Sequence, residues 1–296
     1  MQELRVHPDD VVGLTESVVF QGDAAEILKR VPARSVQCVV TSPPYWSLRD
    51  YHVPGQIGLE KTLDGYVANL VKAFSEVRRV LRADGVMWLN IGDSYTSGGR
   101  TWRAPDKKNP ARAMSVRPDT PKGLKPKDLI GVPWRIAFAL QEDGWYLRSD
   151  TIWEKPNAQP ESVKDRPTKC HEYIFLLSKS EKYHYDWAAI VEPNGRNKRS
   201  VWHVNTQPFT DAHFATFPEK LIEPCILAGS RPGDFVLDPF FGSGTVGVVC
   251  GQLQRKYIGI ELNPDYIEIA EKRLGGLHSP MFIKTICLAG GEQIAF

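Results

Sequence analysis

The stretch TSPPYWSLRD, residues 41–50, comes directly after the apolar run VQCVV, residues 36–40. The apolar run predicts a buried strand, and the segment after it has the pattern of neither a helix nor a strand. Its two prolines lack backbone N–H groups and hold the chain extended, while their carbonyl groups stay free to accept hydrogen bonds. We therefore expect polar and aromatic side chains to line a site at the carboxyl end of a buried strand.

A second motif, FVLDPFFGSGT at residues 235–245, has the pattern of a strand, a glycine-rich turn and the start of a helix. Glycines in such a turn let the backbone fold tightly and let a ligand approach closely. The glycine spacing differs from GxxxxGK[ST], which disfavours a P-loop. It also differs from GxGxxG, so a dinucleotide-binding motif is only weakly supported. The alternative is a turn whose glycines serve only the fold.

Two acidic residues suggest which ligand this turn would hold. Asp238 ends the strand of the motif, and Glu261 ends the next strand along the chain. The first favours a positively charged ligand group over a pyrophosphate, and an acid at the second position commonly holds ribose hydroxyls. A ribose and a cationic group occur together in S-adenosylmethionine.

The whole chain alternates between strand and helix patterns, which predicts an α/β fold with a mostly parallel sheet and helices on both faces. Expected strands are residues 17–20, 36–40, 85–91, 146–154, 172–178, 234–237 and 257–261, with 183–185 as a further candidate. Expected helices are residues 24–31, 64–82, 129–142, 217–228, 245–253 and 264–274, with a kink at Pro224. The tail after Gly275 has too weak a pattern for a prediction.

Composition narrows the class of protein. The chain has 296 residues, a formal net charge of +2 and 42% apolar residues, which is enough for a sizeable core. No apolar run approaches the roughly 18 residues that would span a bilayer, so no membrane association is expected. The N-terminal segment lacks the pattern of a signal peptide. Five cysteines without a CxxC pair indicate a reduced, cytoplasmic protein with no metal site.

Positive charge is concentrated in one segment. Residues 100–128 contain nine Lys or Arg residues against three acidic residues, although the whole chain is close to neutral. The segment is also rich in proline and poor in large apolar residues. It is either a solvated insertion or an arm that contacts phosphates.

Taken together, the two motifs make residues 17–274 resemble a β-group DNA amino-methyltransferase, in which (D/N/S)PP(Y/F/W) precedes FxGxG. Four further segments agree with the family in order and spacing: Gly22-Asp23, DTIWEKPN at 150–157, DRPT at 165–168 with HEY at 171–173, and HFATFPEKL at 213–221. The resemblance implies the Rossmann-like class I methyltransferase fold, with seven strands in the order 3-2-1-4-5-7-6 and strand 7 antiparallel. Here the strands would follow one another as 3, 4, 5, 6, 7, 1, 2, a circular permutation. Both motifs would then lie side by side at the topological switch point.

The resemblance also implies a domain plan and a set of site residues. Residues 1–296 would form one domain, with a catalytic half at 17–186, a cofactor half at 213–274, and DNA-recognition insertions at 98–128 and 190–210. The expected catalytic residues are Ser42, Pro43, Pro44 and Tyr45. S-adenosyl-L-methionine would contact Asp23, Phe217, Pro218, Asp238, Pro239, Phe240, Gly242, Ser243, Gly244, Thr245, Glu261 and Leu262. DNA would contact Trp46, Arg100, Arg103, Lys107, Lys108, Arg112, Arg196, Lys198 and Arg199, with Trp202 and His203 nearby.

The implied reaction is direct methyl transfer from S-adenosyl-L-methionine to the exocyclic amine of a base flipped out of duplex DNA. Ser in the first position of SPPY favours cytosine N4, by family association, over adenine N6. The motif holds no cysteine nucleophile, which argues against C5 methylation of cytosine. Alternatives are an RNA base, a protein amide, or a non-catalytic DNA-binding protein of the same fold. Expected partners are double-stranded DNA and a cognate restriction endonuclease, with the enzyme a monomer or homodimer.

Overall fold

The computed structural model describes residues 14–96, 118–207, 217–275 and 285–287. These residues form one sheet whose strands run in the order β6-β4-β5-β3-β2-β7-β8-β1-β9. The strands are β1 (Val18–Gln21), β2 (Val36–Thr41), β3 (Leu81–Ile91), β4 (Tyr146–Glu154), β5 (His171–Ser178), β6 (Val201–His203), β7 (Phe235–Asp238), β8 (Lys256–Glu261) and β9 (Thr285–Cys287). The helices are α1 (Ala24–Leu28), α2 (Leu63–Val80), α3 (Val132–Glu142), α4 (Glu219–Gly229), α5 (Thr245–Gln252) and α6 (Pro264–Gly275), with a short 3₁₀ helix at Ala188–Ile190.

The sheet confirms the class I methyltransferase fold and its permuted connectivity. From β1 to β4 the order is β1-β8-β7-β2-β3-β5-β4, which is 3-2-1-4-5-7-6 in the family's scheme. Strand β5 is antiparallel to both of its neighbours, β3 and β4. Two short strands that the sequence did not predict, β6 and β9, extend the sheet at its edges, so the described part of the chain has nine strands rather than seven.

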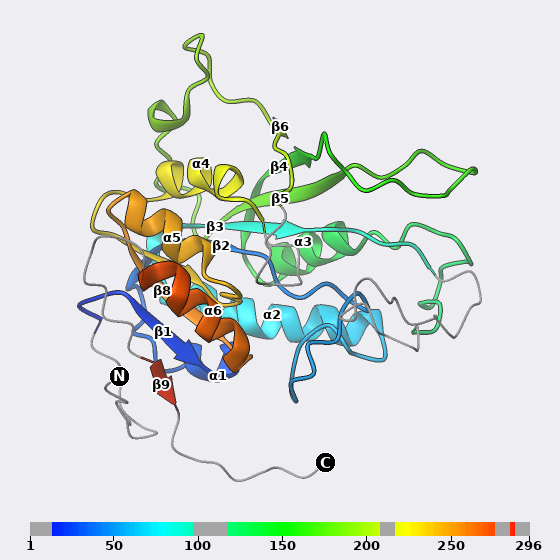
Figure 1. The fold of residues 1–296 in the computed structure, drawn as a ribbon, viewed down its shortest axis with the longest axis horizontal. Helices are drawn as coiled ribbons and strands as arrows, with labels where there is room; N and C mark the ends of the chain where they lie inside the picture. Colours follow the sequence, from blue (N-terminus) through cyan, green and yellow to red (C-terminus); the bar gives the residue numbers. More distant parts are fainter. Residues whose placement is uncertain (1–13, 97–117, 208–216, 276–284, 288–296) are drawn as a thin grey trace.

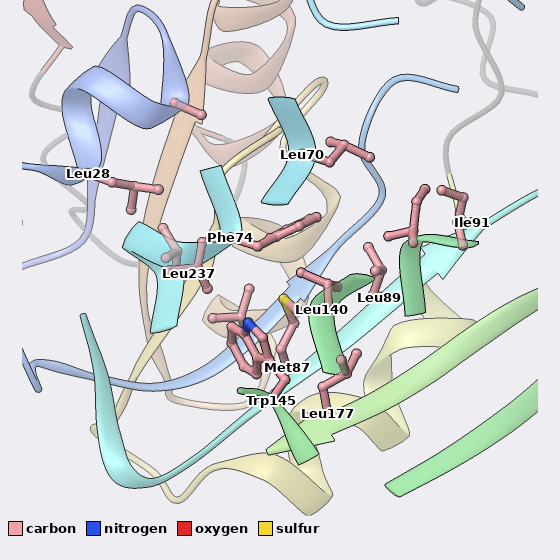
Figure 2. Close-up of a cluster of buried hydrophobic side chains, with 14 of the residues drawn as sticks. Leu28, Leu70, Phe74, Met87, Leu89, Ile91, Leu140, Trp145, Leu177 and Leu237 are labelled. Atoms are coloured by element: carbon pink, nitrogen blue, oxygen red, sulfur yellow. The ribbon is translucent and has the colours of Figure 1, made fainter. Parts of the chain in front are cut away.

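Helices cover both faces of the sheet, and alternate residues of each central strand point into two separate cores. Val39 of β2 belongs to the core beneath α1, α2 and α3, whereas its neighbours Cys38 and Val40 belong to the core beneath α4, α5 and α6. Figure 1 shows α2 on one side of the sheet and α4 and α5 on the other. Figure 2 shows the first core, where Phe74 of α2 and Leu140 of α3 meet Met87 and Leu89 of β3.

Four segments differ from the expected elements. Helix α1 ends at Leu28 rather than at residue 31. Helix α3 begins at Val132 rather than at residue 129, because Gly131 takes a left-handed conformation with φ of 76° directly before it. Residues 183–185 are not a strand; the His184 amide instead donates to the Asp84 carbonyl from a loop. Strand β3 begins at Leu81, four residues earlier than expected, directly after α2. Within the described residues, no helix combines the length and hydropathy needed to cross a membrane.

The glycine-rich turn after β7 folds back over a glycine of the neighbouring strand. The Phe241 ring lies on Gly259 of β8, where an added Cβ would be 2.5 Å from Phe241 Cγ. The same ring stacks on Tyr257, with centroids 5.7 Å apart, and the Phe241 amide donates to the Ile260 carbonyl. Because residue 259 has no side chain, the glycine-rich turn can lie this close to the sheet.

We predict that Gly259→Ala lowers the free energy of unfolding by about 1–3 kcal/mol, because the new methyl group overpacks against Phe241. Thermal or urea denaturation followed by circular dichroism measures this. Gly275→Ala is the matched control, since a Cβ at that position meets nothing within 4 Å. Equal stability of the two variants would contradict the packing argument.

Candidate active site

A hydrogen bond joins the two sequence motifs at the centre of the sheet. Strands β2 and β7 are parallel neighbours, so their carboxyl ends lie at the same edge. The hydroxyl group of Thr41, the last residue of β2, donates to Oδ1 of Asp238, the last residue of β7, at 2.6 Å. The motifs therefore meet in one place although 197 positions separate these two residues.

Asp238 is a buried carboxyl group at the end of β7. Its side chain is 1% exposed, and burial raises its pKa to about 7. The hydrogen bonds from Thr41 and from the Phe240 amide, the latter at 3.0 Å, lower that pKa, and the negative charge of Glu261 raises it. No Lys, Arg or His of the described residues forms a salt bridge with it. A positively charged ligand group would stabilise the ionised form.

Glu261 holds the glycine-rich turn in place. Its Oε2 accepts a hydrogen bond from the Gly242 amide at 2.7 Å, and its Oε1 accepts one from the Asn263 amide at 2.8 Å. Burial raises the pKa of this carboxyl group above its ordinary value. Gly242 and Gly244 have φ of 52° and 81°, the left-handed region that glycine enters without strain. Two carboxyl groups and an open backbone turn thus share one edge of the sheet.

Asp23 lies close to the same edge. The Gly22 amide donates to the Glu261 backbone carbonyl at 2.9 Å, which joins the end of β1 to the end of β8. Asp23 follows and caps α1, with its Oδ1 accepting from the Glu26 amide at 3.0 Å. This cap uses one carboxylate oxygen, so the residue has a structural role that does not preclude a ligand contact.

The remaining residues expected at the cofactor lie around the turn, and several already have partners. Ser243 and Thr245 are buried, and their hydroxyl oxygens accept hydrogen bonds from Arg273 Nη1 at 3.0 and 3.1 Å. Phe240 is half-buried and packs edge-on against Phe74, whereas Pro239 is buried directly after β7. Pro218 is the residue before α4, Phe217 packs against the second core, and Leu262 follows β8.

The SPPY residues form the other side of this edge. Pro43 is buried, and no donor among the described residues reaches its carbonyl group. The Pro44 carbonyl, which we expected to be free, accepts a hydrogen bond from Tyr66 of α2 at 2.8 Å. Ser42 Oγ lies 3.5 Å from the Tyr45 hydroxyl oxygen. Ser42 Oγ and the Pro43 carbonyl accept no hydrogen bond from the described residues, so both remain available to a ligand.

Trp46 corrects the sequence-based expectation that it contacts DNA. Its side chain is 4% exposed and belongs to the first core, and its Nε1 donates to the Glu60 carbonyl at 2.9 Å. A large apolar ring is stabilised by burial when its single N–H finds an acceptor, and both conditions hold here. Trp46 anchors the loop after SPPY instead of lining a surface.

Three polar residues beside Tyr45 were not assigned any role from the sequence. Glu172, at the start of β5, accepts hydrogen bonds from the Tyr45 hydroxyl at 2.7 Å and from Asn90 Nδ2 at 3.3 Å. Lys155, directly after β4, forms a salt bridge with the other oxygen of Glu172. Two of these residues lie in segments that resemble the family, EKPN and HEY, but only the pairing of β4, β5 and β3 shows that all three converge on Tyr45.

The expected DNA-binding residues fall into two groups. Arg100, Arg103, Lys107, Lys108 and Arg112 lie outside the described residues. Arg196, Lys198 and Arg199 lie in the turn before β6, at one edge of the sheet. Arg196 and Arg199 are exposed, while Lys198 Nζ lies 5.0 Å from the centroid of the Trp202 ring.

Trp202 and His203, the neighbours of this turn, are both engaged within the protein. Trp202 is buried, and its Nε1 donates to the Arg199 carbonyl at 2.7 Å. His203 Nδ1 lies 2.6 Å from Glu154 Oε2. These contacts fix β6 against β4, so the basic turn is supported by the sheet.

Comparisons with known proteins agree with this geometry. A family model described as DNA methylase, for N6 and N4 methyltransferases, matches residues 36–272. The type II methyltransferase M.Cfr9I of Citrobacter freundii is 64% identical over 276 residues, which is 92% of this chain and 92% of that protein.

Solved structures show the same fold. The PvuII DNA methyltransferase (cytosine-N4-specific) superposes with a TM-score of 0.68 at 23% identity, over 88% of this chain and 86% of that one. A DNA modification methylase of Thermus thermophilus, complexed with S-adenosyl-L-methionine, has a TM-score of 0.63 at 25% identity, over 88% and 97%.

We predict that binding of sinefungin, a positively charged analogue of S-adenosyl-L-methionine, tightens as the pH rises through about 7, the pKa of the Asp238 carboxyl group. The protonated carboxyl group has no charge to offer a cation, so affinity follows the ionised fraction and increases about tenfold between pH 6 and pH 8. Isothermal titration calorimetry measures this.

The control is Asp238→Asn, which keeps the shape of the side chain and removes its charge. We expect this variant to bind weakly and with the same affinity at both pH values. An affinity of the unaltered protein that is independent of pH would show that Asp238 does not face the cationic group.

Proposed function

Because this chain belongs to the N6/N4 DNA methylase family and is a type II DNA methyltransferase that uses S-adenosyl-L-methionine, we propose that it methylates the exocyclic N4 amine of cytosine. The observation that carries the proposal is the arrangement at the end of β2. The neutral hydroxyl group of Ser42 and the Pro43 carbonyl are available there, directly after the residue whose hydroxyl group donates to the buried carboxyl group of Asp238.

The chemistry of an exocyclic amine explains why two such acceptors are needed. The nitrogen lone pair is delocalised into the ring of the base, which makes the amine a poor nucleophile. Ser42 Oγ and the Pro43 carbonyl would accept hydrogen bonds from its two N–H groups and favour a tetrahedral nitrogen whose lone pair is available. The cofactor would supply the methyl group directly, without a covalent enzyme intermediate: the N–C bond would form as the S–CH3 bond breaks, S-adenosylhomocysteine would leave, and the methylated amine would release one proton to solvent. Positioning and fixed dipoles supply most of the rate enhancement.

Tyr45 would hold the target base after it leaves the duplex. A base inside the double helix cannot reach this edge, so it must be flipped out. The Tyr45 ring is half-buried, and its hydroxyl group is hydrogen-bonded to Glu172, which leaves the ring itself to stack on the base. The site would thus offer the flipped base an aromatic ring next to two acceptors.

We assign the cofactor contacts from the two acidic residues that end β7 and β8. Asp238 would pair with the cationic methionine end, and Glu261 would accept hydrogen bonds from the ribose hydroxyls. Asp23 would bind the adenine amine through the oxygen that does not cap α1. Gly242 and Gly244 would let the ligand approach the backbone. The carboxyl group of Asp238, buried and without a cationic partner among the described residues, is the feature that fits the cationic methionine end best.

Cytosine is proposed over adenine because residue 42 is Ser. In the family that the motif resembles, Ser at this position accompanies N4-cytosine, whereas Asp or Asn accompanies N6-adenine. N6-methylation of adenine by the same mechanism is the alternative.

The proposed setting of the enzyme follows from its relatives. Several are named type II methyltransferases, and they come from bacteria such as Citrobacter freundii and Xanthomonas campestris pv. cyanopsidis. We propose that the enzyme works in the cytoplasm on double-stranded DNA, as a monomer or homodimer, with a cognate restriction endonuclease. Residues 98–128 and 190–210 would be its DNA-recognition insertions, contacting phosphates to position the protein and bases to specify the site.

We predict that the protein, incubated with S-adenosyl-L-methionine and whole-genome-amplified DNA, produces N4-methylcytosine in nucleoside digests analysed by mass spectrometry. Such DNA is unmodified and contains any short recognition sequence many times. Ser42→Ala is the control and should lower the product by about a hundredfold, since it removes one of the two acceptors. N6-methyladenine in its place would retain the fold and mechanism and reject the choice of base.

Neutralising Lys107, Lys108 and Arg112 together should weaken DNA binding and reduce its dependence on salt. Three lost phosphate contacts correspond to a decrease of about 2 to 3 in the slope of log affinity against log salt. Fluorescence anisotropy with labelled duplex DNA measures the slope. Neutralising Lys29, Lys72 and Lys220, which are exposed at the end of α1 and on α2 and α4, removes the same charge elsewhere. Equal slopes for the two triple variants would show that the basic segment is not a phosphate arm.

A further inference from the structure

Ser42, Tyr45 and Glu172 form a chain of hydrogen bonds that leads away from the site of methyl transfer. Ser42 Oγ lies 3.5 Å from the Tyr45 hydroxyl oxygen, and that oxygen lies 2.7 Å from Glu172 Oε2. A hydroxyl group has one proton, so each hydroxyl of the chain donates to one neighbour at a time. The function of the chain therefore depends on the direction in which its protons point.

Glu172 decides that direction because its carboxylate can only accept. Lys155 forms a salt bridge with one of its oxygens, and Asn90 Nδ2 donates to the other. Both side chains of the salt bridge are largely buried, with exposed fractions of 18% for Lys155 and 17% for Glu172. The Tyr45 hydroxyl is also 3.4 Å from Asn90 Oδ1, but the shorter contact to a charged acceptor is the stronger one. Tyr45 thus donates to Glu172.

Because the Tyr45 hydroxyl donates to Glu172, the Tyr45 oxygen accepts a hydrogen bond from the Ser42 hydroxyl. The lone pairs of Ser42 Oγ then face the position of the substrate amine and can accept a hydrogen bond from one of its N–H groups. Building on the proposed function, we propose that Glu172 is a positioning residue: it orients the hydroxyl groups of Tyr45 and Ser42 so that Ser42 acts as an acceptor toward the target amine.

Packing, and not Glu172, holds the Tyr45 ring where it is. Gly92, directly after β3, lies so close to the ring that an added Cβ would be 2.7 Å from Tyr45 Cε2. The ring is also packed against the first core. Changing the acceptor at residue 172 should therefore alter the direction of the protons more than the position of the ring. This distinction makes the proposal testable.

Glu172→Gln is the first variant, because it keeps the size of the side chain and adds a donor. The Lys155 ammonium selects the amide oxygen, which leaves the amide nitrogen to donate to Tyr45. Without a carboxylate acceptor, the Tyr45 hydroxyl donates to Asn90 Oδ1 at 3.4 Å or to Ser42 Oγ at 3.5 Å. Whenever it donates to Ser42, the Ser42 proton points at the substrate amine. We expect kcat to fall by about ten- to a hundredfold with little change in the KM for DNA or in the affinity for sinefungin.

Tyr45→Phe, added to Glu172→Gln, distinguishes a reversed hydrogen bond from a structural defect. The second change removes the reversed donor and keeps the ring, so the double variant should be at least fivefold faster than Glu172→Gln alone. Tyr45→Phe by itself should lose less activity than Glu172→Gln, because a missing hydroxyl leaves Ser42 free to accept. Glu76→Gln, which breaks a salt bridge with Arg79 on α2, is the control for loss of a carboxylate elsewhere.

The measurement is single-turnover methyl transfer to whole-genome-amplified DNA with radiolabelled S-adenosyl-L-methionine, alongside thermal unfolding of each variant. A double variant no faster than Glu172→Gln, a Glu172→Gln variant as fast as the unaltered enzyme, or a Tyr45→Phe variant as slow as Ser42→Ala would each overturn the role of Glu172. These outcomes leave the proposed function intact as long as the unaltered enzyme transfers methyl groups. No transfer by the unaltered enzyme would overturn both.

Discussion

The hydrogen bond from Thr41 to Asp238 is the contact on which the site depends. It joins the last residues of two parallel strands, and those strands carry the two halves of the chemistry. On one side are the acceptors that we propose prepare an amine, and on the other is a buried carboxyl group that suits a cation. Because the donor is a short side chain within a strand, the distance between the two halves is fixed by the sheet and not by a flexible loop. Pre-organisation of this kind is what direct group transfer requires, since there is no covalent intermediate to hold the reactants.

The sequence predicted the central architecture well because its strands are strongly apolar and are followed by distinctive turns. The buried strands that precede SPPY and FxGxG, and the helices between them, lie within a few residues of their expected bounds. Strands β6 and β9 were missed because three residues carry too little periodicity to be recognised, and they are defined by pairing with an existing edge. The start of α3 was misplaced because Leu129 and Ile130 continue the apolar pattern of the helix. The left-handed backbone of Gly131 prevents the helix from extending to them.

The site itself was only partly predictable, for a physical reason. Asp238 and Glu261 can be recognised locally, since each is an acid at the end of an apolar strand. Glu172, Lys155 and Asn90 come from three different strands or their ends, and only the antiparallel position of β5 between β3 and β4 brings them together. Trp46 shows the opposite error. An aromatic residue beside a catalytic motif suggests a pocket wall, yet its N–H finds a backbone carbonyl and the ring packs in the core.

The permuted order of strands has a consequence for how the protein is made. Strands β1 and β2 are separated in the sheet by β8 and β7, which come last among the central strands of the chain. During synthesis, the edge of β2 that pairs with β7 stays unpaired until the ribosome has added the residues up to Asp238, 197 positions after Thr41. At about 5–20 residues per second, that interval lasts roughly 10–40 s. A nascent chain in this state has an open strand edge of the kind that promotes aggregation. It also lacks Asp238, which we propose binds the cofactor, so a truncated or unfinished chain would not modify DNA.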